Sequence, residues 1–329
     1  VDLSRYTVGD GFFDEVFTSP GEARPGRTLL GRWLAESSAE ELAAQPRAAE
    51  QMLLHLGITF NVYGHTDGAE KIFPFDVVPR VLPANEWATI ERGLVQRIAA
   101  LNLFLGDVYG DQRILDANVI PRELVETAAG YLPACRGVKP RKGIYCHIVG
   151  TDLVRDADGA FYVLEDNLRS PSGVSYVLEN RAIMKRVLPR LVEACRVMPV
   201  ETYPSKLLET LQNVSPGTVA EPVCVLLTPG IWNSAYFEHS FLAQQMGIQL
   251  VEGKDLTVRS GYVVMKTTEG LRRVDVIYRR IDDTYLDPLV FRPDSMIGVP
   301  GLFDVWRRGR VSIANAPGTG VADDKAVYP

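Results

Sequence analysis

Two carboxylates and an amide lie within one β-rich stretch of the sequence, and these residue types can bind a metal ion. Glu165 and Asn167 are two residues apart at a strand end, so their side chains share one face if the extended conformation continues. A two-residue turn at Ala157-Asp158 or Asp158-Gly159 places Asp152 diagonal to or opposite Glu165, whereas an odd-length turn would break this alignment. Carboxylate and amide oxygens suit Mg²⁺, which keeps other positions for water and phosphate.

A cation and a predicted helix start follow this acidic face. The Arg169 guanidinium matches phosphate geometry, and a helix opening at Ser172-Gly173 would offer free N–H groups to an anion. Metal ligands, a cation and a helix terminus together describe a phosphoryl-transfer site. The alternative is an acidic strand end that simply runs into a turn.

A second set of polar residues follows a buried strand. The apolar run 223–227, a loop, a helix through Met246 and a strand at 248–251 predict a right-handed βαβ unit. Ligands bind beyond the carboxyl ends of such strands, so the substrate candidates are Asn233, Ser234, Glu238 and His239. His239 is alternatively an exposed residue on a surface helix.

Two arginines end a predicted strand at 271–279. Arg279 and Arg280 either bind a substrate carboxylate or form internal ion pairs with Asp282 and Asp283. A further histidine, His147, falls in the middle of a predicted strand at 143–155 and is expected in the core.

The elements that position these residues are mixed helices and strands. The first third reads as helical, with a capping box at 38–41 and a long amphipathic helix from Asn85 to Val108. A hairpin over 143–164 precedes a helix from 174 that Pro189 should divide. The fold class is α/β with α+β character, and 213–218 is the best linker.

Composition excludes several classes of protein. The 329 residues carry 35 Lys plus Arg against 41 Asp plus Glu, a net charge of −6, which argues against a nucleic-acid partner. No stretch reaches the roughly 18 apolar residues that span a membrane. The 4 cysteines form no CxxC pair, so a disulfide framework or zinc site is not expected, and we predict a cytoplasmic protein.

Several motifs give these patterns a family context. Residues 150–159 and 163–181 resemble the circularly permuted ATP-grasp family (type 2), which is related to the synthetase domain of glutathionylspermidine synthase. The likeness continues at 233–239, 250–256, 276–283, 291–295 and 318–328. It implies an ATP-grasp-like fold with a βαβ pre-ATP-grasp-type domain. It also implies that Asp152, Glu165 and Asn167 hold Mg²⁺.

The resemblance implies further roles and one departure. Relatives place an arginine two residues before the metal-binding Asp, where this chain has Gly150, so Arg169 or Arg155 would supply the catalytic cation. ATP would contact Ser172, Gly173 and Lys325. The family continues past 318–325 into a glycine-rich loop with ATP-gripping lysines, whereas this sequence stops at Pro329. We therefore expect either a truncated chain or a missing ATP clamp.

The sequence-based hypothesis is an ATP- and Mg²⁺-dependent carboxylate–amine ligase that acts through an acyl phosphate and releases ADP. Its partners would be small-molecule or peptide carboxylates and amines. The alternative is a non-catalytic ATP-grasp-like binding or assembly module. A dinucleotide enzyme is disfavoured because residues 228–230 are not followed by G-x-G-x-x-G spacing. The expected domains are a helical and metal-ligand part (1–212), the linker (213–218), a βαβ substrate domain (219–317) and the start of the clamp (318–329).

Overall fold

The computed structural model describes residues 2–9, 11–60, 71–72, 75–217 and 220–327, which fall into two compact units. Unit 1 comprises 1–93, 153–163 and 173–201, and unit 2 comprises 94–152, 164–172 and 202–329. These units do not follow the predicted domain borders. Helix α8 (Tyr203–Asn213) packs against the strands and helix that follow it, so residues 213–217 of the predicted linker at 213–218 fall inside unit 2, and residue 218 lies outside the described residues.

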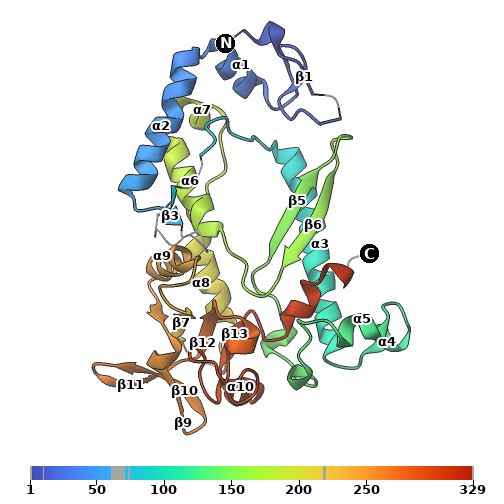
Figure 1. Ribbon diagram of the computed structural model, residues 1–329, viewed down its shortest axis with the longest axis vertical. Coiled ribbons are helices and arrows are strands. Elements are labelled where there is room, and N and C mark those ends of the chain that lie inside the picture. The colour runs from blue at the N-terminus through green and yellow to red at the C-terminus, as the bar shows by residue number, and fades with distance from the viewer. Residues whose placement is uncertain (1, 10, 61–70, 73–74, 218–219, 328–329) are drawn as a thin grey trace. The chain divides into compact units, whose positions relative to one another are not determined.

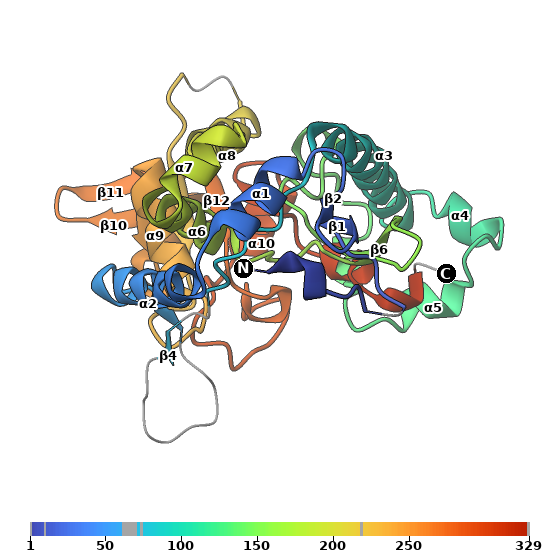
Figure 2. The same cartoon turned by 90° about the horizontal axis from the view of Figure 1, so that it is seen from above.

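Unit 1 is mainly helical. Helix α2 starts at the predicted capping box, in which the Ser38 side chain accepts from Glu41 N–H and the Glu41 carboxylate accepts from Ser38 N–H. Helix α6 lies beside α2 (Figures 1 and 2), and Pro189 separates it from α7 as predicted. The elements are the 3₁₀ turn Leu3–Arg5, β1 Phe17–Ser19, β2 Glu22–Ala23, α1 Thr28–Glu36, α2 Ala39–His55, β3 Thr59–Phe60, β4 Lys71–Ile72, α6 Val174–Val187 and α7 Pro189–Ala194.

Unit 2 begins within a long helix. Helix α3 spans Ala84–Val108, which confirms the predicted amphipathic helix, and it enters unit 2 at Leu94. Its buried Leu101, Leu105 and Val108 belong to the core that also covers the sheet of unit 2. Short elements follow: α4 Arg113–Asp116, α5 Arg122–Glu126, and 3₁₀ turns at Pro133–Cys135 and Arg141–Gly143.

A four-stranded parallel sheet forms the centre of unit 2. Its order is β13-β12-β7-β8, with β7 Cys224–Leu227, β8 Gln249–Val251, β12 Val276–Arg279 and β13 Ser312–Ala314 (Figure 1). Helix α9 (Tyr236–Met246) joins β7 to β8, so the predicted βαβ connection is present. Every residue of β7, β12 and β13 is buried, as expected for parallel strands covered on both faces.

The predicted strand at 271–279 is wrong because the chain changes sheets within it. Strand β11 (Gly270–Arg273) pairs with β10 (Tyr262–Thr267), which pairs with β9 (Leu256–Arg259) in an antiparallel meander. Val274 N–H still donates to Val263 O, whereas Asp275 N–H donates to Val223 O beside the parallel sheet. The buried Asp275 carboxylate accepts from Val223 N–H at 3.0 Å and fixes this change of sheet.

The hairpin that carries the acidic residues is shorter than predicted. Strands β5 (Gly150–Arg155) and β6 (Phe161–Asn167) pair, but residues 144–149 form no strand. His147 therefore lies in a loop, where its N–H donates to the Asn315 side chain at 2.7 Å. The remaining elements are α10 Leu302–Arg307 and 3₁₀ turns at Gly253–Asp255, Asp283–Tyr285, Thr319–Ala322 and Lys325–Val327.

None of the helices in the described ranges combines the length and the apolar character that crossing a membrane requires.

Candidate substrate and metal site

The carboxyl ends of two adjacent parallel strands open onto one cavity of unit 2. Strand β7 leads into Thr228 and then helix α9, and β12 leads into Arg280. Both strands run in the same direction, so these loops leave the same edge of the sheet. The cavity has a volume of about 320 Å³ and is lined by Asn167, Arg169, Ser170, Ser172, Asn233, Ser234, Ala235, His239, Arg280, Asp282 and Asp323.

Arg280 is held rigidly at this cavity. Its guanidinium pairs with Glu238 at 3.0 Å, and both side chains are 1% exposed. It also donates to Ser172 Oγ and to Pro171 O, each at 2.6 Å. One buried nitrogen, Nε, has no hydrogen-bond partner among the described residues. A charge-assisted network of this kind fixes the orientation of the guanidinium toward a ligand.

His239 is buried rather than exposed on a surface helix, so that alternative is wrong. Its Nδ1 lies 2.9 Å from Thr228 Oγ1, and the residue is 2% exposed. Burial, with a further contribution from the nearby Arg280 charge, lowers the pKa of His239 to about 3. The imidazole is therefore neutral at pH 7, where it can form hydrogen bonds but carries no charge.

Arg169 lies between two carboxylates that also line the cavity. Its Nε is 2.7 Å from Asp323 and its Nη1 is 3.0 Å from Asp282. The Arg169 side chain is 45% exposed, in contrast to Arg280. The cavity thus presents two guanidinium groups and two carboxylates, a combination that matches a ligand carrying both an ammonium and a carboxylate.

The three predicted metal ligands come together, but not by the predicted turn. Asp156 N–H donates to Ala160 O and Gly159 N–H donates to Asp156 O, so three residues separate the paired positions. Gly159 has φ +84°, the left-handed conformation that such a turn needs. The Glu165 carboxylate nevertheless lies close enough to the side chains of Asp152 and Asn167 to influence, and be influenced by, them electrostatically.

The electrostatics of this trio favour a cation. Burial first, and then the hydrogen bond and charge of Glu165, raise the pKa of Asp152. Glu165 is paired with Lys325, whose Nζ is 2.7 Å from Oε2, and this contact lowers the pKa of Glu165. The described residues contain no group of three or more His, Cys, Asp or Glu that could hold a metal ion. The third candidate oxygen donor beside the two carboxylates is the amide of Asn167. Two carboxylates and an amide oxygen fit Mg²⁺.

Comparison with known proteins identifies the family. The model of the circularly permuted ATP-grasp type 2 family matches residues 79–329. This chain belongs to that family. An uncharacterized protein of Synechocystis sp. is 56% identical over 328 residues, which cover 100% of this chain and 68% of that protein. An uncharacterized protein of Mycobacterium tuberculosis is 51% identical over 316 residues, 96% of this chain and 57% of that protein.

More distant likenesses extend this result. A Frankia alni protein, provisionally named glutamate–cysteine ligase 2-3, is 40% identical over 327 residues, 99% of this chain and 37% of its own length. A solved structure of a glutathione synthetase-like effector from Globodera pallida has a TM-score of 0.56 at 17% identity, covering 88% of this chain and 65% of that one. That likeness shows the fold alone. The chain spans between about a third and two thirds of the length of each of these relatives.

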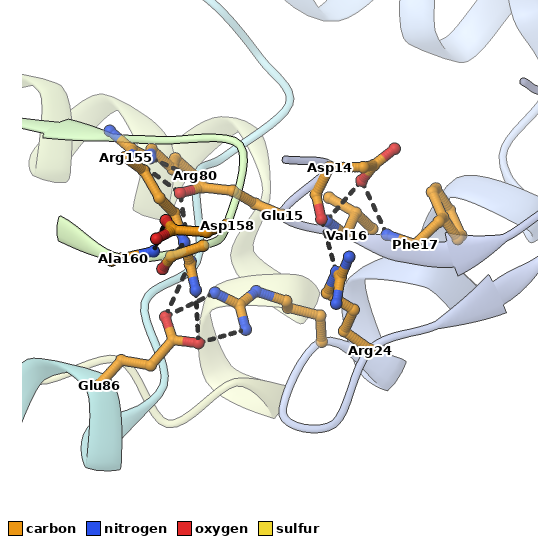
Figure 3. A network of polar contacts seen from close by, with 12 residues as sticks. Asp14, Glu15, Val16, Phe17, Arg24, Arg80, Glu86, Arg155, Asp158 and Ala160 are labelled. Atoms are coloured by element: carbon orange, nitrogen blue, oxygen red, sulfur yellow. Dashed lines mark hydrogen bonds and ion pairs between the residues drawn. The ribbon is translucent and has the colours of Figure 1, made fainter. Parts of the chain in front are cut away.

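Arg155 of this ATP-grasp chain does not line the cavity. It belongs to unit 1, where its guanidinium pairs with Glu86 at 3.1 Å and Glu15 at 3.3 Å (Figure 3). Its Nε donates to Gly159 O at 3.0 Å, and its guanidinium stacks 4.1 Å over the ring of Phe13. These contacts use the charge of Arg155 to hold the tip of the hairpin within unit 1, and Arg169 is the better candidate for the cation.

Two other predicted contacts also lie apart from the cavity lining. Gly173 caps helix α6 with φ +115° and belongs to unit 1. Arg279 is 0% exposed, pairs with Asp283 at 2.8 Å and donates to the carbonyl oxygens of Asn315, Ala316 and Ile281. Arg279 therefore forms the internal ion pair that the sequence analysis left open, and its role is structural.

Several lining residues of this ATP-grasp cavity were not predicted from the sequence. Asp282 and Asp323 both lie in motifs that carried the family resemblance, at 276–283 and 318–328, but their charges were not assigned to the site. Asp323 accepts from Leu168 N–H at 2.5 Å as well as from Arg169. The position of two acidic residues in family motifs was the available signal.

Proposed function

We propose that this chain forms the substrate- and metal-binding part of an ATP-dependent carboxylate–amine ligase for amino-acid-like substrates. The observation that carries the proposal is the cavity of unit 2, which joins Arg169 and Arg280 to Asp282 and Asp323 next to a potential metal ligand, Asn167. The family membership and the ligase name of the Frankia alni relative support it.

The lining residues suggest how such a substrate is oriented. Arg280, with Ser172 bonded to it, would receive a substrate carboxylate, because its guanidinium is buried and fixed. The carboxylates of Asp282 and Asp323 would hold an ammonium group. Neutral His239 would donate or accept a hydrogen bond without adding charge. These contacts would position the reacting carboxylate before any bond is formed.

The reaction we propose has two displacements. A carboxylate oxygen of the substrate takes the γ-phosphoryl group of ATP and releases ADP. The amine nitrogen then attacks the resulting acyl phosphate, loses a proton and releases phosphate. Asp152, Glu165 and Asn167 are the residues that would hold Mg²⁺, which supplies neutralisation of phosphate charge. Arg169, half-exposed beside the same cavity, would stabilise the transferred phosphoryl group.

The test is an ADP-release screen on the full-length protein with pairs of amino-acid carboxylates and amines. We expect ADP and phosphate to appear only when Mg²⁺ and both substrates are present. Release of AMP instead of ADP would contradict the acyl-phosphate route. Substrate-independent ATP hydrolysis alone would contradict the ligase assignment.

One contact favours the alternative of a non-catalytic ATP-grasp-like binding module. The Lys325 ammonium already pairs with Glu165, so a cation from the chain occupies part of the predicted metal position. If the module hypothesis holds, Mg²⁺ will not strengthen ATP binding, as measured by calorimetry with and without the metal. A Mg²⁺-dependent gain in ATP affinity would favour the ligase.

A further inference from the structure

A second cavity in unit 2 shares no lining residue with the candidate site. It has a volume of about 410 Å³, within the range of small-molecule sites. Its walls come from the loop before β5, the end of α8, the end of α10 and strand β13. The lining residues are Lys139, Pro140, Arg141, Lys142, Gly143, His147, Val214, Trp306, Gly309, Val311, Ser312 and Ile313.

One side of this cavity is apolar. Trp306 contributes an indole that is 5% exposed, and Val214, Val311 and Ile313 are buried beside it. Ser312 Oγ donates to Val214 O, so its hydroxyl is used internally. An aromatic and aliphatic wall of this kind accommodates the apolar body of a ligand and offers little to a purely polar one.

Another part of the lining is basic. Lys139, Arg141 and Lys142 come from one short segment that turns at Lys142, with φ +57°, and Gly143, with φ +70°. Lys139, Arg141 and Lys142 make no ion pair with a carboxylate within the ranges that the structure describes, and no acidic residue lines the cavity. The cavity therefore differs from the candidate site, in which acidic and basic groups balance.

His147 adds an unused polar atom. Its Nδ1 is buried without a hydrogen-bond partner among the described residues. Burial lowers the pKa of His147 to about 4, so its ring is neutral at pH 7. An orphaned buried polar atom costs free energy and is unusual in a native protein, and a bound ligand would satisfy it.

We propose that this cavity binds a small organic carboxylate whose apolar or aromatic body packs on Trp306. The carboxylate would lie against the basic segment 139–142, and a polar atom of the ligand would bond to His147 Nδ1. The three lining cations disfavour a positively charged ligand, and the apolar wall disfavours a bare inorganic anion. The proposal is independent of the ligase function, because it uses no residue assigned to that site.

The test uses tryptophan as a reporter of position. The chain has 4 tryptophans, and only Trp306 lines this cavity, while Trp232 adjoins Asn233 of the candidate site. In protein labelled with 5-fluorotryptophan, the Trp306 fluorine resonance is assigned by its loss in Trp306→Phe. We expect indole-3-propionate to shift the Trp306 resonance saturably and to leave that of Trp232 in place. The neutral indole-3-propanamide should bind at least ~10-fold more weakly, because it lacks the charge.

A charge-reversal pair tests the basic segment. Arg141→Glu should weaken indole-3-propionate binding at least ~10-fold. Arg272→Glu is the matched control, because Arg272 is an exposed arginine on β11 that does not line the cavity, and it should leave the affinity unchanged. Equal urea midpoints of both variants would show that folding is unaffected. The proposal is overturned if Trp306 does not respond, if Trp232 responds instead, if the amide binds equally well, or if Arg272→Glu weakens binding as much as Arg141→Glu.

Discussion

Each unit contains one of the two arginines that are alternative candidates for the catalytic cation, and their surroundings differ. Arg155 in unit 1 pairs with the carboxylates of Glu15 and Glu86 (Figure 3). Its side chain is 9% exposed, donates to a carbonyl oxygen and lies over two aromatic rings. Arg169 in unit 2 also pairs with two carboxylates, but it is 45% exposed and lines a cavity. Ion pairing is common to both, so the open cavity beside Arg169, rather than its charge, distinguishes a potential site from a structural network.

The largest expected effect is at the potential metal ligands of unit 2. Glu165→Gln removes one carboxylate from the trio, so Mg²⁺-dependent ADP release should fall about a thousandfold. Stability should change little, because the ion pair of Glu165 with the exposed Lys325 is partly open to solvent. Glu269→Gln, at the exposed turn of the meander, is the control and should keep full activity. A wild-type rate of Glu165→Gln at saturating Mg²⁺ would remove Glu165 from the mechanism.

The second prediction separates stability from function at the buried pair of unit 2. Arg280→Ala removes the guanidinium that pairs with the buried Glu238 carboxylate, which should cost about 3 kcal/mol of unfolding free energy. The double variant Arg280→Met/Glu238→Leu removes both charges and should recover most of that loss in urea unfolding. It should not recover substrate binding, measured as KM. If the double variant binds substrate normally, Arg280 does not contact the substrate.

The third prediction concerns the acid sensitivity of unit 2. The folded pKa of His239, about 3, lies below the unfolded value of 6.5, so the unfolded chain binds more protons between these values. Stability should therefore fall as pH drops from 6.5 toward 3, by about 2 kcal/mol between pH 7 and pH 4.5 for this group. His239→Asn should remove that part of the loss in urea titrations. His147, with a pKa of about 4, contributes in the same direction, and His147→Asn measures its share.

The fourth prediction is that alanine substitutions of the two arginines have opposite effects, one on activity and the other on stability. Arg169→Ala should lower kcat/KM about tenfold with little change in unfolding free energy, because the side chain is half-exposed. Arg155→Ala should do the opposite: it should cost about 1–2 kcal/mol of stability and leave kcat/KM per folded molecule nearly unchanged. A loss of kcat/KM in Arg155→Ala as large as in Arg169→Ala would contradict the assignment.

Local patterns predicted the elements well, because capping and periodicity act within a few residues. The capping box of α2, the long helix α3, the division at Pro189 and the βαβ connection all have such signals. The strand at 271–279 was predicted incorrectly because its change of sheet depends on Asp275, which bonds to Val223 far earlier in the chain. Long-range pairing of this kind leaves no local periodicity.

The residue types of the candidate site could be predicted from the sequence, but most contacts between their side chains could not. The spacing of Glu165 and Asn167 and the position of Asp152 pointed to one cluster, and the structure brings these side chains together despite a three-residue turn. The burial of His239 and the pairing of Arg280 with Glu238 could not be inferred, because they depend on packing between helix α9 and the end of β12. The same limit hid the role of Asp323, which bonds to Leu168 across 155 residues.

The smallest expected effect is the loss of stability of unit 1 in acid, which can be compared with the loss linked to His239 in unit 2. The hydrogen bond from Arg27, assisted by Arg155, lowers the pKa of Glu86 to about 2, below its usual 4.5. A depressed carboxylate pKa stabilises the fold above the unfolded value, and this stabilisation is lost as pH falls from 4.5 toward 2. Solvent screening of this partly exposed pair reduces the effect to about 1 kcal/mol.

Glu86→Gln isolates this contribution. Between pH 5 and pH 3, the protection factors of the α1 amides, which correct for the pH dependence of intrinsic exchange, should fall in the wild-type chain, whereas in the variant they should already be lower at pH 5 and change less. The loss of stability linked to His239 begins near its unfolded pKa of 6.5, and the loss linked to Glu86 begins near 4.5. Amides of β7 in unit 2 should therefore lose protection at a higher pH than those of α1. Simultaneous loss of protection in both units would mean that they unfold as one cooperative body, and the separate acid responses assigned to Glu86 and His239 would then be wrong.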